Sequence, residues 1–277
     1  MLGDMSRTGT AQETLAIVER GSYRAPSGRE VDVRTAIEAA IHGTRLFTPD
    51  ELASLAPTPS DAPPPRIEVT PETTAAAARR LVEAERERGV LALNFASAKN
   101  PGGGFLGGAR AQEEDLARCS ALYACQLTQR AYYDANRADG TMLYTDHLIW
   151  SPEVPFFRDE RLDLLEAPFL VSILTAPAPN AGAASGRAEA SRVREVLEAR
   201  AGKVLAVAAA QGHRVLVLGA WGCGVFRNDP RHVAEAFAGW LAHPRFRGAF
   251  DRVVFAVYDR GKGQPNLAAF RERFGVA

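Results

Sequence analysis

Three consecutive acidic residues, Glu113, Glu114 and Asp115, are the side chains of this sequence best placed to do chemistry, because five glycines in residues 102–108 come shortly before them. A carboxyl group can donate and accept a proton, so neighbouring acids suit general acid–base catalysis. Glycine lets a ligand approach the main chain, so the amides of such a segment can bind phosphate oxygens. The pattern predicts a ligand site beside carboxyl groups. The alternatives are a flexible turn and acids that only complement the dipole of a helix.

A second glycine-rich segment, residues 219–230, follows the predicted strand 213–218 and precedes a helical pattern. Its glycines, Gly219, Gly222 and Gly224, again allow a backbone turn that binds an anion. The segment has neither the Gly-Lys-Ser/Thr of a P-loop nor a full dinucleotide-binding fingerprint. Taken alone, it is a weak indication of a phosphate site.

Alternating strand and helix patterns are expected to position both glycine segments. Strands are predicted at 66–69, 90–95, 169–174, 215–218 and 253–257, and helices at about 70–88, 112–130, 189–210, 230–242 and 265–273. This alternation favours an α/β fold with a largely parallel sheet. Both glycine segments then follow the carboxyl ends of strands, where ligands bind in open α/β sheets. Residues 176–188 are expected to form a mobile surface loop.

The N-terminal part of the sequence has a different pattern. Residues 10–20 and 31–43 carry apolar side chains at three-to-four spacing, which predicts two short helices. Residues 48–65 are rich in Pro, Ala, Ser and Asp and are expected to be extended. We therefore predict an N-terminal helical extension, residues 1–62, and a catalytic core, residues 63–277.

The composition excludes several classes of protein. Hydrophobic residues make up 46% and charged residues 24%, as in ordinary folded domains. Lys and Arg together number 33, as do Asp and Glu, so no overall positive field favours DNA or an acidic membrane. No run approaches the roughly 18 apolar residues that a membrane span needs, and the N-terminus lacks an apolar signal core.

The three cysteines, Cys119, Cys125 and Cys223, lack the spacing of metal ligands. We expect reduced thiols in a cytoplasmic protein. Cys223 is a poor candidate for a nucleophile because its surroundings offer no paired histidine, with His213 lying ten residues away across a strand. A small side chain that fits the glycine segment is the simpler interpretation.

Two motifs together resemble a known family. Residues 102–104 (Gly-Gly-Gly), followed after seven residues by 112–114 (Gln-Glu-Glu), resemble the signature of microbial-type poly(ADP-ribose) glycohydrolases. Residues 221–226 (Trp-Gly-Cys-Gly-Val-Phe) are similar to the diphosphate-binding loop of the same family. The resemblance implies a macrodomain-like three-layer α/β fold with a mixed, largely parallel central sheet, here with the N-terminal helical extension. It implies ADP-ribose as the ligand and neither metal nor cofactor.

The resemblance also implies roles for individual residues. Glu114 would be the catalytic acid, Glu113 would bind ribose hydroxyls near the scissile bond, and Gln112 would fix the loop. The amides of residues 222–226 would grip the diphosphate, and Phe226 would pack against the distal ribose. The implied ADP-ribose contacts are Ser97, Asn100, Gly102, Gly103, Gly104, Gly222, Cys223, Gly224, Val225, Phe226 and Tyr258.

Two of these contacts have an alternative interpretation, and one departs from the family pattern. Phe226 could instead be an ordinary core aromatic. Tyr258, assigned to the adenosine end, could be a half-buried structural tyrosine. Ser97 stands where related enzymes can carry an asparagine for ribose contact.

The implied reaction is hydrolysis of the O-glycosidic ribose–ribose bonds of poly(ADP-ribose), with release of ADP-ribose from chain ends. Glu114 would protonate the leaving oxygen and then activate water. The expected partners are poly(ADP-ribose), ADP-ribose and ADP-ribosylated proteins, and the expected state is a monomer that binds neither membrane nor DNA. The alternatives are a macrodomain that binds ADP-ribose without cleaving it, and a hydrolase of free ADP-ribose derivatives. Gln112-Glu113-Glu114 favours an enzyme because a binding module does not need this motif.

Overall fold

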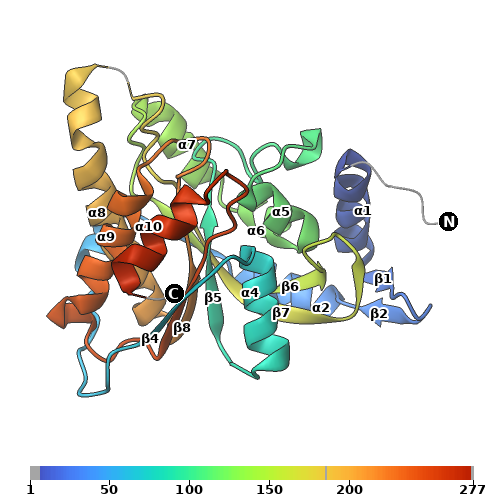
Figure 1. Ribbon diagram of the computed structural model, residues 1–277. Coiled ribbons are helices and arrows are strands. Elements are labelled where there is room, and N and C mark those ends of the chain that lie inside the picture. The colour runs from blue at the N-terminus through green and yellow to red at the C-terminus, as the bar shows by residue number, and fades with distance from the viewer. Residues whose placement is uncertain (1–6, 185, 276–277) are drawn as a thin grey trace.

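The computed structural model describes residues 7–184 and 186–275, and its centre is a seven-stranded sheet (Figure 1). In spatial order the strands are β3 (Arg45–Phe47), β6 (Leu148–Arg158), β7 (Leu164–Ala176), β5 (Val90–Phe95), β8 (Val215–Leu218), β9 (Arg252–Ala256) and β4 (Arg66–Thr70). The run from β7 to β4 is parallel throughout, whereas the β6–β7 and β3–β6 pairs are antiparallel. The predicted mixed, largely parallel sheet is confirmed.

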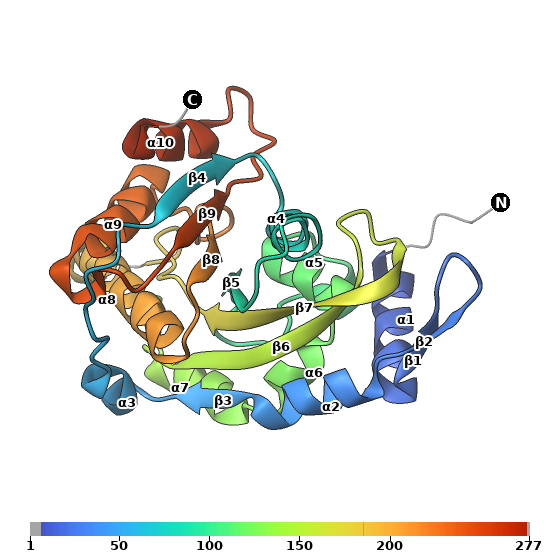
Figure 2. The same cartoon turned by 90° about the horizontal axis from the view of Figure 1, so that it is seen from below.

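Helices cover both faces of this sheet (Figure 2). The side chains of β5 alternate between two cores: Leu91 and Leu93 belong to one, and Val90 and Ala92 to the other. Successive side chains of a strand point to opposite faces, so an apolar strand needs cover on both. The first core is covered by α8 (Arg187–Ala210), α9 (Pro230–Ala242) and α10 (Pro265–Phe274), and the second by α2 (Arg34–Gly43), α4 (Thr74–Arg79), α5 (Gln112–Cys119) and α6 (Leu122–Leu127). The three-layer α/β fold is therefore confirmed.

The N-terminal segment packs closely on the rest of the molecule. Its elements are α1 (Arg7–Arg20), the hairpin of β1 (Ser22–Arg24) and β2 (Glu30–Asp32), α2, β3 and α3 (Pro49–Ser54). Ala11 of α1 packs with Phe105, which lies within the first glycine segment, and with Ala117 of α5. β3 pairs with β6 and so adds an edge strand to the central sheet. The division into residues 1–62 and 63–277 stays a prediction, and its first six residues lie outside the described part.

The prediction of one continuous helix over residues 112–130 is wrong. That segment is divided into α5 and α6, and α7 (Arg130–Asp139) follows. Between α5 and α6, Ser120 is extended (φ −148°, ψ −179°) and forms a β-bridge with Phe156. The apolar periodicity runs through this break because Leu116 and Leu122 face the same core, so the sequence pattern does not reveal it.

Three further segments differ from the predictions. Residues 48–65, expected to be extended, contain the helix α3, whose start is capped by Thr48 because its side chain accepts a hydrogen bond from the Glu51 amide. The helix predicted up to residue 88 ends earlier, because α4 passes into a single π-helical turn, Arg80–Ala84. The predicted surface loop 176–188 begins buried, since Ala176 and Ala178 belong to the first core; its residue 185 lies outside the described part, and α8 already begins at Arg187. Short 3₁₀ turns occur at Phe105–Gly107 and Pro244–Phe246. In the described part of the chain, no helix combines the length and apolar character needed to cross a membrane.

Candidate active site

A cavity of about 860 Å³ opens where β5, β8 and β9 end. Residues at the ends of these strands or shortly after them line it, including Phe95, Ala220 and Val257. Because the strands are parallel, their carboxyl ends meet at one edge of the sheet, which is where ligands bind in open α/β folds. The second glycine segment lines the cavity, and so do Gln112, Glu113 and Glu114, which follow the first segment, so the two motifs are brought to one site.

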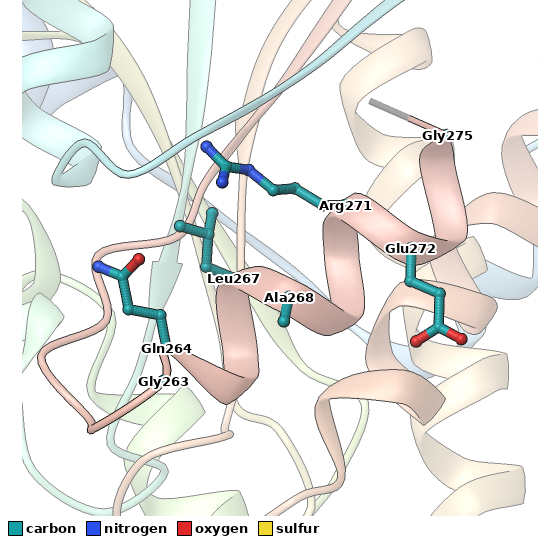
Figure 3. A pocket seen from close by; sticks show the side chains of 7 residues that line it. All are labelled: Gly263, Gln264, Leu267, Ala268, Arg271, Glu272 and Gly275. Carbon is teal, nitrogen blue, oxygen red and sulfur yellow. The ribbon is translucent and has the colours of Figure 1, made fainter. Parts of the chain in front are cut away.

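A second hollow, of about 620 Å³, lies on the surface of α10 (Figure 3). Its wall includes Gln264, Leu267, Arg271 and Glu272. Neither glycine segment reaches it, and one acid and one arginine on a helix surface make no acid–base pair. The candidate active site is therefore the cavity at the strand ends.

The first glycine segment is packed tightly against the two glutamates. A Cβ atom on Gly103 would lie 2.4 Å from Glu114 Oε1 and 3.1 Å from Glu113 Oε2. The φ angle of Gly103 is +57°, a conformation that residues with side chains rarely adopt. Glycine is thus required at this position by the protein's own carboxyl groups.

Glu113 is buried behind this segment. Its Oε1 accepts hydrogen bonds from Asn94 Nδ2 (3.1 Å) and Gln126 Nε2 (2.8 Å), and its Oε2 accepts one from the Ser97 amide (2.6 Å). Burial raises the pKa of Glu113 to about 7, and the three hydrogen bonds oppose that rise. The carboxyl group of Glu113 therefore titrates near neutral pH in a fixed orientation.

Glu114 lies at the cavity wall with 8% of its surface exposed. Its Oε1 accepts a hydrogen bond from the Gly104 amide (2.9 Å) and its Oε2 accepts one from the Ala111 amide (3.0 Å). Each carboxylate oxygen has two lone pairs, so both oxygens keep acceptor capacity for a ligand. Backbone amides thus hold the carboxyl group of Glu114 in place, and its oxygens can still accept hydrogen bonds from a ligand.

Gln112 ties the start of α5 to the end of β5. Its Oε1 accepts a hydrogen bond from the Phe95 amide (2.8 Å), and its Nε2 donates to Leu93 O (2.7 Å) and Thr74 Oγ1 (3.0 Å). All of its bonds go to the protein. This geometry suits a residue that fixes the loop and the helix rather than one that reacts.

The second glycine segment is held from behind and open in front. A Cβ atom on Gly222 (φ +74°) would lie 2.4 Å from Asn228 Nδ2 and 2.6 Å from Ala178 Cβ. By contrast, a Cβ atom on Gly224 would have no neighbour within 4 Å, and Val225 is 80% exposed. The backbone at residues 224–225 is therefore accessible from the cavity, as a diphosphate site requires.

Comparisons with known proteins agree with this geometry. The family model "Microbial-type PARG, catalytic domain" matches residues 11–159, more than half of the 277 residues. The chain belongs to the microbial-type PARG family. Its matched region begins within the predicted N-terminal extension and continues beyond the predicted boundary at residue 62.

Solved structures of poly(ADP-ribose) glycohydrolase (PARG) resemble this microbial-type PARG over nearly its whole length. The enzyme from Thermomonospora curvata is 52% identical over 97% of this chain and 99% of its own, with a TM-score of 0.93. The same enzyme bound to the inhibitor ADP-HPD has a TM-score of 0.90. The enzyme from Deinococcus radiodurans in complex with ADP-ribose is 48% identical over 86% of this chain and 96% of its own, with a TM-score of 0.80. Among curated proteins, none matches this chain.

The residues predicted to contact ADP-ribose divide into two groups in this microbial-type PARG. Those that line the cavity are Ser97, Gly222, Gly224, Val225, Phe226 and Tyr258. Those that lie outside its wall are Asn100, Gly102, Gly103, Gly104 and Cys223. The second group includes the glycines that support the glutamates, so a role in positioning fits them better than direct ligand contact.

Three predicted residues of the second segment and the strand end have distinct surroundings. The ring of Phe226 lies 5.9 Å from that of Tyr144 and packs on the first core. Tyr258 is half exposed, and the Arg260 guanidinium lies 5.0 Å from its ring centre. Burial raises the pKa of the Cys223 thiol to about 12, so that thiol is un-ionised at neutral pH.

Two residues that support Glu113 were not predicted from the sequence. Asn94 lies on the apolar strand β5, and Gln126 lies on the buried face of α6. Gln126 also accepts a hydrogen bond from the Gly102 amide (2.9 Å), so it joins the glycine segment to Glu113. The signal was a polar side chain at a position where the pattern demands an apolar one.

Arg200 of α8 is a further residue that the sequence did not indicate. It is buried and donates hydrogen bonds to the carbonyl oxygens of Pro177 (2.9 Å), Leu143 (3.0 Å) and Tyr144 (3.0 Å). The segment after Pro177 in turn supports the second glycine loop, because the Gly182 amide donates to Phe226 O (2.9 Å). Arg200 therefore stabilises the segment that supports the second glycine loop.

In the described residues, no group of three or more His, Cys, Asp or Glu side chains is arranged to hold a metal ion.

Proposed function

We propose that this protein hydrolyses the ribose–ribose O-glycosidic bonds of poly(ADP-ribose) and releases ADP-ribose. The observation that carries the proposal is the position of Glu114: the amides of Gly104 and Ala111 hold its carboxyl group at the wall of the cavity that the second glycine loop also lines. Membership of the microbial-type PARG family supports the same activity.

In the proposed mechanism, Glu114 acts first as an acid and then as a base. Its proton passes to the leaving ribose oxygen as the bond from that oxygen to the anomeric carbon breaks. The resulting carboxylate takes a proton from water, whose oxygen bonds to the anomeric carbon. Glu114 is thereby returned to its starting state, and one water molecule is consumed for each bond cleaved.

Glu113 is proposed to hold the ribose beside the scissile bond. Its carboxyl oxygens accept three hydrogen bonds from the protein, so a carboxylate with four lone-pair positions has one left for a ribose hydroxyl. The raised pKa of Glu113 means that this group is part neutral and part ionised near pH 7. Gln112 is proposed to fix the loop through its bonds to Phe95, Leu93 and Thr74.

The second glycine loop is proposed to bind the diphosphate of ADP-ribose. The open backbone at Gly224 and Val225 supports this role, because main-chain amides can approach the phosphate oxygens there without a side chain between them. Phe226 is proposed to pack on the distal ribose, and Tyr258 to lie at the adenosine end. Asn100, residues 102–104 and Cys223 are proposed to act through the two loops rather than by direct contact, since they lie outside the cavity wall.

A binding module that does not cleave ADP-ribose is the rival from a different class. It would need both loops but not a carboxyl group free to exchange a proton at the cavity. The position of Glu114 favours the enzyme. A hydrolase of free ADP-ribose derivatives is the second rival and differs only in substrate.

The test is incubation of the purified protein with poly(ADP-ribose) and, separately, with monomeric ADP-ribose derivatives, followed by mass spectrometry of the products. Free ADP-ribose from the polymer is the expected product. Tight binding of ADP-ribose without any cleavage would establish the binding module instead, and cleavage of the monomeric derivatives alone would establish the second rival.

Cleavage is proposed to begin at chain ends. The C-terminal segment is better placed than α1 to cover the adenosine end, because Tyr258, Arg260 and Asn266 line the cavity on the β9 side, whereas Arg7 of α1 lines it beside α5. A time course on size-fractionated polymer should show free ADP-ribose from the earliest points and few short oligomers. Early dominance of mid-length fragments would show that the adenosine end is open. Deletion of residues 1–62 is not a clean test, since it removes β3 and several core residues, among them Ile17 and Ile37.

We also propose that the protein acts as a cytoplasmic monomer on ADP-ribosylated proteins and free polymer, without DNA or membrane partners. The balanced net charge and three free cysteines support this setting. Size-exclusion chromatography with light scattering tests the monomer.

A further inference from the structure

The cavity continues past Glu114 on the side away from the second glycine loop. There its wall includes Arg7 of α1, Arg110 of the loop before α5, and Arg161 of the β6–β7 turn. β7 and β6 lie on one side of β5 in the sheet, and β8, which leads into the second glycine loop, lies on the other. In both cartoon views, α1 and the β6–β7 turn lie on one side of α5, and α9 and α10 lie on the other (Figures 1 and 2).

The positive charges of these three arginines are not neutralised by ion pairs in the described residues. None of them forms an ion pair within the described part of the chain, and Arg7 Nε is buried without a hydrogen-bond partner there. Two acids, Asp115 and Glu160, line the same end. Asp115 pairs with Arg118 at 3.0 Å and also interacts electrostatically with Arg7, whereas Arg79, the arginine whose pKa Glu160 helps to raise, is paired with Glu83. The three arginines outnumber these two acids. The end of the cavity beyond Glu114 is therefore suited to an anion.

The proposed substrate supplies an anion at this place. Each unit of poly(ADP-ribose) carries a diphosphate, and the scissile bond joins two units. If the unit being released lies over the second glycine loop, the unit left behind must pass Glu114 and leave by the other end of the cavity. Its diphosphate then comes within reach of long, flexible side chains such as arginine, which bind phosphate through paired N–H donors.

We propose that Arg7, Arg110 and Arg161 form a subsite for the diphosphate of the unit that remains on the polymer. This inference rests on the proposed function. The subsite binds the leaving side of the substrate, contributes to polymer affinity and makes no contact with free ADP-ribose in the catalytic pocket. It makes the enzyme prefer a phosphate-bearing leaving group to a neutral one.

The test compares two substrates: short poly(ADP-ribose), and ADP-ribose joined through its anomeric oxygen to a small uncharged aryl alcohol. In the double variant Arg110→Gln/Arg161→Gln, the ratio of kcat/KM on the polymer to kcat/KM on the aryl glycoside should fall about tenfold, the loss expected for two partly exposed charged contacts. The matched control is Arg24→Gln/Arg192→Gln, which removes two exposed arginines that do not line the cavity. A wild-type ratio in Arg110→Gln/Arg161→Gln would overturn the proposal, whether kcat/KM stays unchanged on both substrates or falls equally on both.

Binding provides a second measurement that does not depend on turnover. The affinity of the Arg110→Gln/Arg161→Gln variant for labelled polymer, divided by its affinity for ADP-ribose, should also fall about tenfold relative to wild type. If the wild-type protein cleaves neither substrate, the proposed function fails, while this affinity ratio still decides whether the arginines bind the second diphosphate. A ratio equal to that of wild type would dismiss the subsite.

Discussion

The two glycine segments look alike in sequence, but their glycines have different surroundings in the structure. At Gly103 a Cβ atom would lie 2.4 Å from Glu114 Oε1, so the protein itself needs glycine there. At Gly224 a Cβ atom would have no neighbour within 4 Å, so the folded protein has no such need. One segment shapes carboxyl groups, and the other leaves room for a ligand. The same residue type therefore predicts opposite consequences of mutation at the two positions.

Hydrogen bonding shows the same contrast. In the first segment the bonds run from the loop to the reactive side chains: the Gly104 and Ala111 amides donate to Glu114. In the second segment they run from the loop to the scaffold behind it, as when Asn228 Nδ2 donates to Pro179 O (2.8 Å). We propose that the first loop serves catalysis and the second serves binding, and mutations in each loop can test that division.

The largest effect is expected for Glu114→Gln, which should separate catalysis from binding. The amide keeps the shape of the side chain but cannot exchange the proton, so kcat should fall about a thousandfold, while the Kd for ADP-ribose stays within about tenfold. Turnover of poly(ADP-ribose) and calorimetry of ADP-ribose binding measure the two quantities. The control Glu195→Gln changes an exposed acid of α8 and should retain both. Near-normal turnover in Glu114→Gln would remove this residue from the mechanism.

The next largest effect is expected for Gly103→Ala. The methyl group would overlap Glu114 Oε1 and occupy a positive φ angle of +57°. Together, strain and overlap should lower the free energy of unfolding by about 3 kcal/mol, and kcat should fall at least tenfold because Glu114 is displaced. Denaturant unfolding and polymer turnover provide the measurements. Wild-type values for both would show that the loop can move away from the glutamates.

The difference between the segments also explains how much the sequence revealed. The buried parallel strands are local patterns, so they were predicted correctly, whereas the roles of both glycine runs and of Gln112-Glu113-Glu114 stay predictions. The supports of the site were not predicted, because Asn94, Gln126 and Arg200 act on residues distant in the chain. A single sequence does not show which distant residues meet, so the hydrogen-bond network behind each loop came only from the structure.

The strands that were missed have a similar cause. β3 is three residues long, and β6 carries Pro152 and Pro155 with register shifts against β7. Neither gives a continuous apolar run, although pairing with a neighbouring strand makes each one regular. The break between α5 and α6 at Ser120 was hidden because one buried face continues across it.

The third prediction concerns how the free energy of unfolding depends on pH, and it compares Glu113, beside the first segment, with Cys223 of the second. Burial raises the pKa of Glu113 to about 7, so the folded protein holds a proton that the unfolded chain releases near pH 4.5. The contribution of this group to stability is complete below pH 4.5 and is lost as the pH rises to 7, by up to about 3 kcal/mol. Denaturant unfolding from pH 4.5 to 7.5 should show this loss in wild type but not in Glu113→Gln.

The second segment supplies the control for this pH dependence. Its thiol, Cys223, has a pKa raised to about 12, well outside the range measured, so Cys223→Ser should keep the wild-type slope between pH 4.5 and 7. Equal slopes in wild type and Glu113→Gln would mean that the buried carboxyl group is ionised throughout, with its three hydrogen bonds outweighing burial.

The smallest effect is expected for Gly224→Val, and it concerns binding alone. Nothing in the folded protein occupies the space beside Gly224, so the melting temperature should match that of wild type. The valine side chain would instead separate the backbone from a diphosphate, and the Kd for ADP-ribose should rise about tenfold, the loss of one or two charge-assisted hydrogen bonds. Calorimetry and thermal unfolding of the same samples give both values.

Gly107→Val is the matched control, because a Cβ atom on Gly107 would also have no neighbour within 4 Å, but this glycine lies in the first segment, outside the cavity wall. Valine there should leave both the melting temperature and the Kd for ADP-ribose unchanged. If Gly224→Val binds ADP-ribose as tightly as Gly107→Val does, the ligand does not approach the backbone of the second loop. The contrast between a loop that shapes carboxyl groups and a loop that admits the ligand would then fail, since neither open glycine would be needed for binding.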